Sequence, residues 1–194
     1  MVRTILRQDR VPVPEEVKME VKSKIITVEG PKGTLKKDFR KVPVQIIPER
    51  DDTGRVVAVL IRIWFAKNKP KSCVNTLRKH VQNMILGVTK GFMTVMKFGF
   101  KFFAMKITAT DGGKGLQIEK FAGQNYVRKI KCVEGVTVDV SQDIAKKEIN
   151  VCGIDPEAVG LTCSLINQSC KYRDVDSRIY LDGIYIFERK FQDN

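Results

Sequence analysis

The sequence predicts an α+β fold made of two tandem, similar domains, each an antiparallel sheet packed against one helix. Two observations predict it. In each half of the chain, short alternating apolar runs come first and a segment with helical spacing follows. The two halves can also be laid over each other with nearly constant spacing, which indicates an internal duplication. We place the N-terminal domain at residues 1–90 and the C-terminal domain at 91–194.

Extended structure is expected first in the N-terminal half. Residues 17–29 and 34–39 alternate in β-like fashion around Gly30-Pro31-Lys32-Gly33, which predicts a hairpin. Residues 55–63 form a β-prone run after the turn at 51–54. A helix should follow, because apolar residues recur on one face from Val74 to Val88, with Pro70 or Ser72 near its start.

The C-terminal half repeats this order. Strands are expected within 93–109, 116–119, 126–130, 136–140 and 148–152, with a hairpin turn at the glycines of 112–115. Asp155-Pro156-Glu157 has the composition of a helix start, with a capping Asp, a Pro in the first turn and an acid near the positive end. A last strand is expected around Ile184 and Ile186.

The correspondence between the halves is specific. Ile26, Val28, Glu29 and Gly33 match Leu116, Ile118, Glu119 and Gly123 at a spacing of 90 residues. With one inserted residue, Leu35, Lys37 and Phe39 then match Tyr126, Arg128 and Ile130. Chance alternation is the competing explanation, and the shared order of elements favours duplication.

The charge of the chain predicts a polyanionic partner. The formal net charge is +13, and a surplus of that size favours binding to nucleic acid. Residues 1–90 hold 20 Lys and Arg against 9 Asp and Glu, residues 91–131 hold 8 against 2, and residues 132–170 hold 2 against 6. The acidic stretch should therefore face away from the polyanion.

The five cysteines are odd in number and lack metal-ligand spacing, so we expect reduced, mostly buried thiols in a cytosolic protein.

The pattern of residue types along the sequence does not indicate catalysis, a cofactor or a metal site. The single histidine, His80, has no nucleophile or orienting partner in sequence, and we expect it to face solvent or RNA. No phosphate-binding or dinucleotide fingerprint is present, and no apolar run is long enough for a membrane span. We expect no enzyme activity, no cofactor, no metal, no small-molecule substrate and no membrane contact.

Two motifs have an RNA-binding alternative. Gly30-Pro31-Lys32-Gly33 has the form of a KH-domain loop, but its strand-like flanks favour a hairpin turn. Residues 97–103, KFGFKFF, place Phe98, Phe100 and Phe102 on one strand face, where they could stack on bases as in an RRM. Packing in a core is the favoured interpretation for these phenylalanines.

Residues 171–190 are the strongest candidate for RNA contact. Basic residues alternate there with tyrosines, and Asp182-Gly183 is expected to form a tight turn at which backbone could approach RNA. Arginine grips phosphate in bidentate fashion, and tyrosine stacks on bases or bonds to ribose hydroxyls. A solvated tail beside an ordinary strand is the alternative.

Three stretches resemble a known family. VEGPKGTLKKDF at 28–39, HVQNMILGVTKGF at 80–92 and RIYLDGIYI at 178–186 are similar, in this order and spacing, to the universal large-subunit ribosomal protein six family in its eukaryotic and archaeal form. The resemblance covers nearly the whole chain. It implies two similar α+β domains, which agrees with the repeat.

The resemblance also implies a function and a set of contact residues. It implies a structural protein of the cytosolic large ribosomal subunit, nucleolar during assembly, which binds ribosomal RNA near the sarcin–ricin region and the translation-factor side, beside neighbouring ribosomal proteins. The expected RNA contacts of the C-terminal domain are Lys171, Arg173, Arg178, Tyr180, Gly183, Tyr185 and Lys190. Basic loop residues of the N-terminal domain, Lys32, Lys36 and Lys37, are expected to contribute less. The competing hypotheses are a free RNA-binding regulator and an RNA-modifying enzyme.

Overall fold

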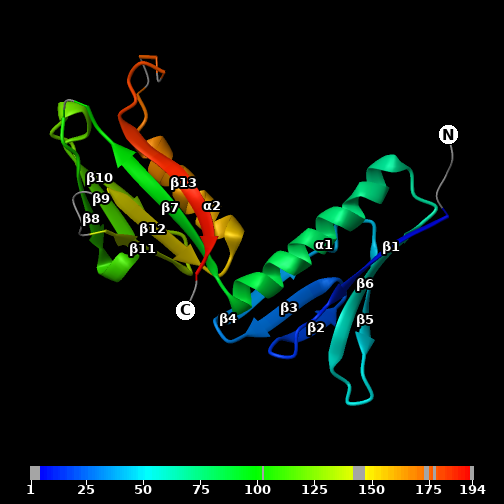
Figure 1. Ribbon diagram of the computed structural model, residues 1–194. Coiled ribbons are helices and arrows are strands. Elements are labelled where there is room, and N and C mark those ends of the chain that lie inside the picture. Colours follow the sequence, from blue (N-terminus) through cyan, green and yellow to red (C-terminus); the bar gives the residue numbers. More distant parts are fainter. Residues whose placement is uncertain (1–4, 102, 142–146, 173–174, 177, 193–194) are drawn as a thin grey trace. The chain divides into compact units, whose positions relative to one another are not determined.

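The computed structural model describes residues 5–101, 103–141, 147–172, 175–176 and 178–192. Two compact units, Met1–Lys90 and Gly91–Asn194, divide the chain, and each is visible in Figure 1. Strands in every sheet pair antiparallel to their neighbours. The predicted α+β fold, with two similar sheet-and-helix units, is therefore confirmed.

The first unit has six strands and one long helix among the described residues. Its elements are β1 (Leu6–Pro12), β2 (Lys18–Lys22), β3 (Ile25–Gly30), β4 (Gly33–Asp38), β5 (Gln45–Arg50), β6 (Val56–Trp64) and α1 (Asn68–Thr89). The strands form two sheets, in the orders β1-β6-β5 and β2-β3-β4. Seven buried residues of α1 include the predicted apolar face from Val74 to Val88, and this face packs on strands of both sheets.

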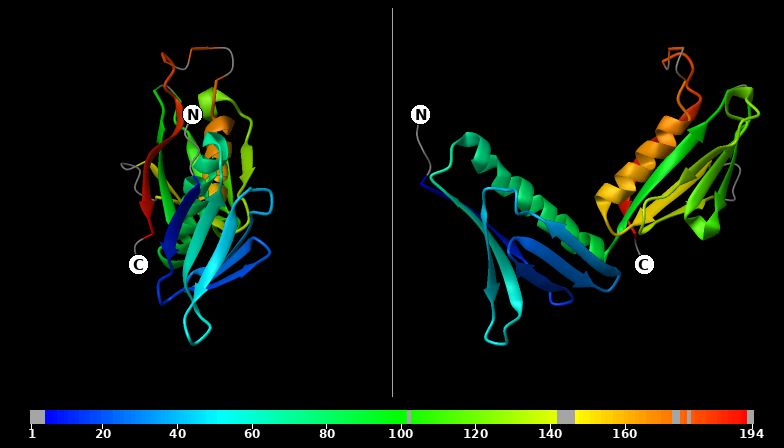
Figure 2. Two further views of the ribbon diagram at one scale, coloured as in Figure 1. Left: turned by 90° about the vertical axis from the view of Figure 1, so that its right-hand side faces the viewer. Right: turned by 180° about the vertical axis from the view of Figure 1, so that it is seen from behind.

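The second unit repeats this plan and adds a strand. Its elements are β7 (Phe92–Gly99), β8 (Lys106–Thr110), η1 (Asp111–Gly113), β9 (Gly115–Glu119), η2 (Phe121–Gly123), β10 (Arg128–Lys131), β11 (Val136–Val140), β12 (Glu148–Gly153), α2 (Pro156–Ser169) and β13 (Gly183–Phe191). The sheets run β10-β9-β8 and β11-β12-β7-β13. Figure 2 shows α2 lying along one face of this unit's strands.

The two units share one topology, which supports the predicted duplication. The hairpin order β2-β3-β4 corresponds to β8-β9-β10, and β1-β6-β5 corresponds to β7-β12-β11. Ile26 pairs with Lys37, whereas Leu116 pairs with Ile130. The third hairpin strand is thus displaced by 93 residues, two more than the sequence alignment predicts. The loop that contains η2 accommodates the additional residues.

Several local predictions are confirmed and some are corrected. Gly30-Pro31-Lys32-Gly33 is the turn of a hairpin between β3 and β4, and a Cβ on Gly30 would lie 2.7 Å from Cγ2 of Val88, so glycine lets the hairpin approach α1. Asp155 caps α2 by accepting a 3.2 Å hydrogen bond from Glu157 N. The region 93–109 is not one strand, because β7 ends at Gly99 and β8 joins a different sheet.

The aromatic motif and the cysteines contribute to packing. Phe98 and Phe100 pack against the core of the second unit, which favours the core interpretation over base stacking; Phe102 lies outside the described residues. All five cysteines are free, and three of them are buried. Burial raises the pKa of the Cys163 and Cys170 thiols, so both are protonated at neutral pH. His80 is half-buried, with its ring 6.1 Å from that of Phe39.

Candidate nucleic-acid interface

The predicted contact residues of the second unit lie in the segment that follows α2 and on the edge strand β13. Lys171, Arg178, Tyr180 and Tyr185 are exposed, and the two tyrosines expose 47% and 43% of their surface. Arg173 lies outside the described residues. The exposed side chains are therefore available to a macromolecular ligand.

Asp182 anchors this segment to the rest of the unit. The Asp182 carboxylate is buried and accepts a 2.8 Å hydrogen bond from the backbone N–H of Lys101. It also accepts a hydrogen bond from the Tyr172 hydroxyl at 3.5 Å. Burial, followed by the negative charge of Asp182, raises the pKa of Tyr172. These contacts hold both ends of the segment between α2 and β13.

A row of aromatic rings supports the same segment. The Tyr172 ring lies 5.2 Å from the Phe121 ring and 5.9 Å from the Tyr180 ring, between centroids. Phe121 is buried, whereas Tyr180 is half exposed. Edge-to-face and tilted pairs at this spacing stabilise the arrangement. The row therefore fixes an exposed aromatic surface at Tyr180.

Gly183 serves local packing. It is buried, and a Cβ there would lie 3.1 Å from the Tyr185 hydroxyl and 3.2 Å from the Cys170 carbonyl oxygen. Glycine thus lets the backbone pass close to the end of α2. The predicted tight turn at Asp182-Gly183 is wrong, because these residues run directly into β13; the turn lies at 178–179.

Strand β13 forms an edge of its sheet and is irregular. Phe187 has no partner on β7, because the register shifts between Ile186 and Glu188. The Lys97 ammonium lies 3.6 Å from the centre of the Phe187 ring. Lys190 forms a 2.8 Å ion pair with Glu188, so this predicted contact residue has its charge balanced locally.

The three predicted lysines of the first unit have different surroundings. Lys32 donates from Nζ to the carbonyl oxygen of Lys90 at 2.6 Å, next to the C-terminal end of α1. Lys36 is exposed, whereas Lys37 is half-buried, as expected for neighbours on opposite faces of β4. Lys32 therefore has a structural role at the helix end.

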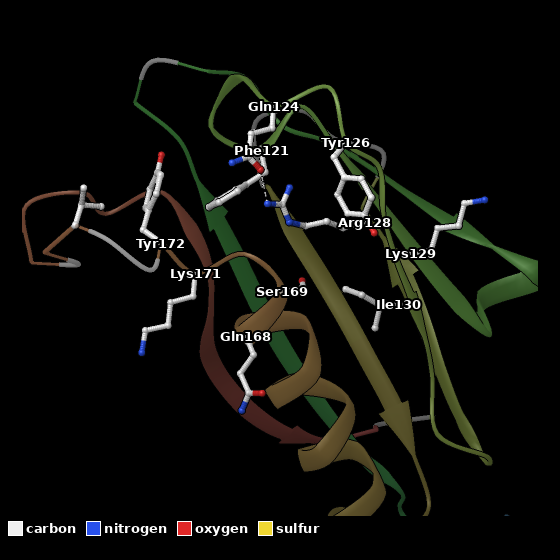
Figure 3. Close-up of a pocket in the computed structure, with 11 residues that line it drawn as sticks. Phe121, Gln124, Tyr126, Arg128, Lys129, Ile130, Gln168, Ser169, Lys171 and Tyr172 are labelled. Atoms are coloured by element: carbon white, nitrogen blue, oxygen red, sulfur yellow. Dashed lines mark hydrogen bonds between the residues drawn. The ribbon is translucent and has the colours of Figure 1, made fainter.

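A cavity that the sequence did not indicate as a site lies beside the predicted contact residues. Its volume is about 580 Å³, and it is bounded by η2, β10, the end of α2 and the segment after it. Its lining residues are Phe121, Gln124, Tyr126, Arg128, Lys129, Ile130, Gln168, Ser169, Lys171, Tyr172 and Val175. Figure 3 shows the Arg128 guanidinium pointing toward Phe121 and Gln124. The only sequence signal was the positive charge of 91–131 with Tyr126 and Arg128 two residues apart.

The described part of the chain contains no group of three His, Cys, Asp or Glu side chains arranged to hold a metal ion. None of the described helices has the length and apolar character needed to cross a membrane.

Comparison with known proteins gives a consistent result. The family model described as Ribosomal protein L6 matches residues 13–91. The large ribosomal subunit protein uL6 of Tetrahymena thermophila is 33% identical over 193 residues, which cover 100% of both chains. The large ribosomal subunit protein uL6A of Schizosaccharomyces pombe is 34% identical over 189 residues, 97% of this chain and 96% of that one. The uL6 protein of Ignicoccus hospitalis is 34% identical, with 98% of each chain covered.

Proposed function

Because this chain belongs to the ribosomal protein L6 family, we propose that it is a structural constituent of the large ribosomal subunit and that it supports translation by binding ribosomal RNA. The observation that carries this proposal is the similarity to uL6 proteins of a ciliate, a yeast and an archaeon over essentially the whole length of each chain. Similarity across both units is expected if both have a role in the same assembly. The protein would act by binding and shape, without catalysis or a cofactor.

The RNA-binding surface that we propose is the segment from Lys171 to Tyr185 with β13. Lys171 and Arg178 supply exposed positive charge, and Arg173 adds a third basic residue in sequence. Tyr180 and Tyr185 supply half-exposed rings. Cations that replace the counterions of RNA phosphates make binding favourable and salt-dependent, and tyrosine rings contact bases or ribose. Asp182 would hold the segment in shape while it binds.

The charge of this segment alone would not carry the interaction. Residues 171–194 contain five Lys and Arg and also five Asp and Glu. Binding would therefore depend on which side chains face the RNA, and the exposed Lys171 and Arg178 matter more than the net charge. Lys190, paired with Glu188, would contribute less than these two.

The finer location is also part of the proposal. The family resemblance favours ribosomal RNA near the sarcin–ricin region, on the translation-factor side, with other ribosomal proteins as neighbours. The ribosome would be the cytosolic one, and assembly would begin in the nucleolus. The exposed Lys36 and the half-buried Lys37 of the first unit would add a secondary contact.

Sedimentation tests the main proposal. A tagged full-length chain should travel with large ribosomal subunits on a sucrose gradient and stay bound at moderate salt. Recovery only in the soluble fractions would contradict it. Deleting 171–194 is a poor probe of the surface, because the deletion removes β13 and the buried Ile184. A Lys171→Gln/Arg178→Gln double variant is the cleaner test and should incorporate less than Lys106→Gln, a control on the exposed side of β8.

A further inference from the structure

The cavity beside Arg128 has the composition of an anion site. Arg128, Lys129 and Lys171 are among its lining residues, and no Asp or Glu is among those that the structure describes. In Figure 3, the Arg128 guanidinium points toward Phe121 and Gln124, whereas the side chains of Lys171 and Lys129 run away from it on opposite sides. Arg128 is therefore the most central of the three cations, and Lys171 adds positive charge to the lining.

Arg128 is held in place but retains binding capacity. Its Nη2 donates a 2.6 Å hydrogen bond to Oε1 of Gln124, and its guanidinium lies 4.8 Å from the Phe121 ring centre. Nη1 is buried and has no hydrogen-bond partner in the described part of the chain. A buried donor without an acceptor costs free energy, and a ligand oxygen that accepts its hydrogen bond removes this cost. Because Nη1 is buried, the guanidinium would have to turn and release Gln124 before a phosphate oxygen could accept this N–H.

Arg128 does not cap the C-terminal end of α2. The C-terminal end of α2 attracts cations, and Ser169 at that end lines the cavity. However, the side-chain hydrogen bond of Arg128 goes to Gln124, in the loop after η2, and not to a carbonyl of the helix. Arg128 therefore stiffens the cavity wall without capping the helix.

Aromatic surface completes the site. Tyr126 exposes 70% of its surface, and the Arg128 guanidinium lies 5.9 Å from its ring centre. Tyr172 forms part of another wall. Exposed rings of this kind stack on unpaired bases, and the contribution does not depend strongly on which base is present. The volume of about 580 Å³ is within the range of small-ligand pockets and suits one nucleotide.

We propose that this cavity binds one unpaired nucleotide of RNA, with the phosphate at Arg128 and the base against Tyr126. The inference rests on the proposed function, because it takes RNA as the partner, and it adds a specific site outside the predicted contact residues, Lys171 excepted. A flat duplex surface would not enter the cavity, so the ligand is a single-stranded or bulged position.

The test uses the full-length chain and a short single-stranded oligoadenylate RNA as the probe. Arg128→Gln and Tyr126→Ala should each weaken binding by at least about fivefold. Lys131→Gln removes the same charge from an exposed neighbour on β10 and should stay within about twofold of the unmodified chain. Tyr126→Phe keeps the ring and should restore binding.

A measurement on the unmodified protein tests the site without relying on variants, which could lose binding through misfolding. On addition of the oligoadenylate, the NMR signals of the Arg128 Nε–H and the Tyr126 ring should shift together. Absence of these shifts would overturn the proposal. Loss of affinity in Arg128→Gln but not in Tyr126→Ala would also overturn it, because a site for phosphate alone would remain.

The same series separates the two proposals. If the chain binds large-subunit RNA while both cavity variants bind the oligoadenylate normally, the nucleotide site is wrong and the proposed function stands. If the chain binds no large-subunit RNA and does not join large subunits, the proposed function itself fails.

Discussion

The carboxylate of Asp182 accepts a 2.8 Å hydrogen bond from the backbone N–H of Lys101, a residue 81 positions earlier in the chain. The bond ties the start of β13 to the segment that follows β7, and these two strands are neighbours in the sheet. The other carboxylate oxygen of Asp182 accepts a hydrogen bond from the Tyr172 hydroxyl. One buried carboxylate thus links three segments under the proposed RNA surface.

Replacing Asp182 should loosen that surface. Asp182→Ala leaves the Lys101 N–H without its acceptor and should lower the free energy of unfolding of the second unit by about 1–2 kcal/mol. Asp182→Asn keeps an oxygen in place and should lose less. Amide hydrogen exchange at Lys101 and along β13 measures the effect. Equal protection in all three proteins would show that the bond contributes nothing.

The raised pKa of Tyr172 predicts a loss of stability in alkaline solution. Its causes are burial and the nearby Asp182 carboxylate. The unfolded chain then releases the phenolic proton at a lower pH than the folded chain. The contribution of Tyr172 to the free energy of unfolding is fully present below its ordinary pKa of 10.0. This contribution is lost as the pH rises through the higher pKa of the folded chain.

The phenolate absorbance of the four tyrosines measures this shift. Tyr172→Phe should remove the phenol whose pKa is raised, and Asp182→Asn should bring the pKa of Tyr172 closer to its ordinary value. A titration curve that is identical with and without Asp182 would contradict the assignment of the cause.

Salt dependence should separate phosphate contacts from structural cations. Lys171→Gln and Arg178→Gln should each weaken binding to large-subunit RNA and reduce the slope of log affinity against log salt by about 1. Lys32→Gln should leave the slope unchanged, because Lys32 bonds to the carbonyl of Lys90. Unchanged slopes for both the Lys171 and the Arg178 variants would show that the RNA binds another surface of the protein.

Local signals predicted most elements of the fold. The change from alternation to helical spacing located α1, and Asp155-Pro156-Glu157 located the start of α2. Strand β1 was missed because Gln8, Asp9 and Arg10 break the apolar pattern. An edge strand tolerates polar residues on its exposed side, and β1 lies at the edge of its sheet.

The candidate site was less accessible to sequence reasoning. Exposed Lys171, Arg178, Tyr180 and Tyr185 were predicted because they alternate locally along the chain. The cavity was missed because Phe121, Arg128 and Tyr172 come together only when β10 and α2 pack. Gly183 was expected at an RNA contact, yet the close neighbour that requires glycine is the Cys170 carbonyl. Local patterns indicate exposure, but they do not reveal which distant residue a backbone approaches.

Alanine substitutions at Gly183 and Gly160 should change the free energy of unfolding in opposite directions. A Cβ on Gly183 would lie 3.1 Å from the Tyr185 hydroxyl and 3.2 Å from the Cys170 carbonyl oxygen, so these neighbours or the backbone at Gly183 must shift by a few tenths of an ångström. We expect Gly183→Ala to lower the free energy of unfolding by about 1 kcal/mol or more. It should also weaken RNA binding, because the added methyl group displaces the Tyr185 hydroxyl.

Gly160 is the matched control in the same unit. It lies within α2, and a Cβ there meets nothing within 4 Å. Gly160→Ala should therefore raise the free energy of unfolding by about 0.5–1 kcal/mol, because alanine has less backbone freedom to lose in a helix. Chemical denaturation of the two variants measures both signs. Equal stabilisation of both would mean that the backbone at Gly183 has room for a side chain and that glycine there has no packing role.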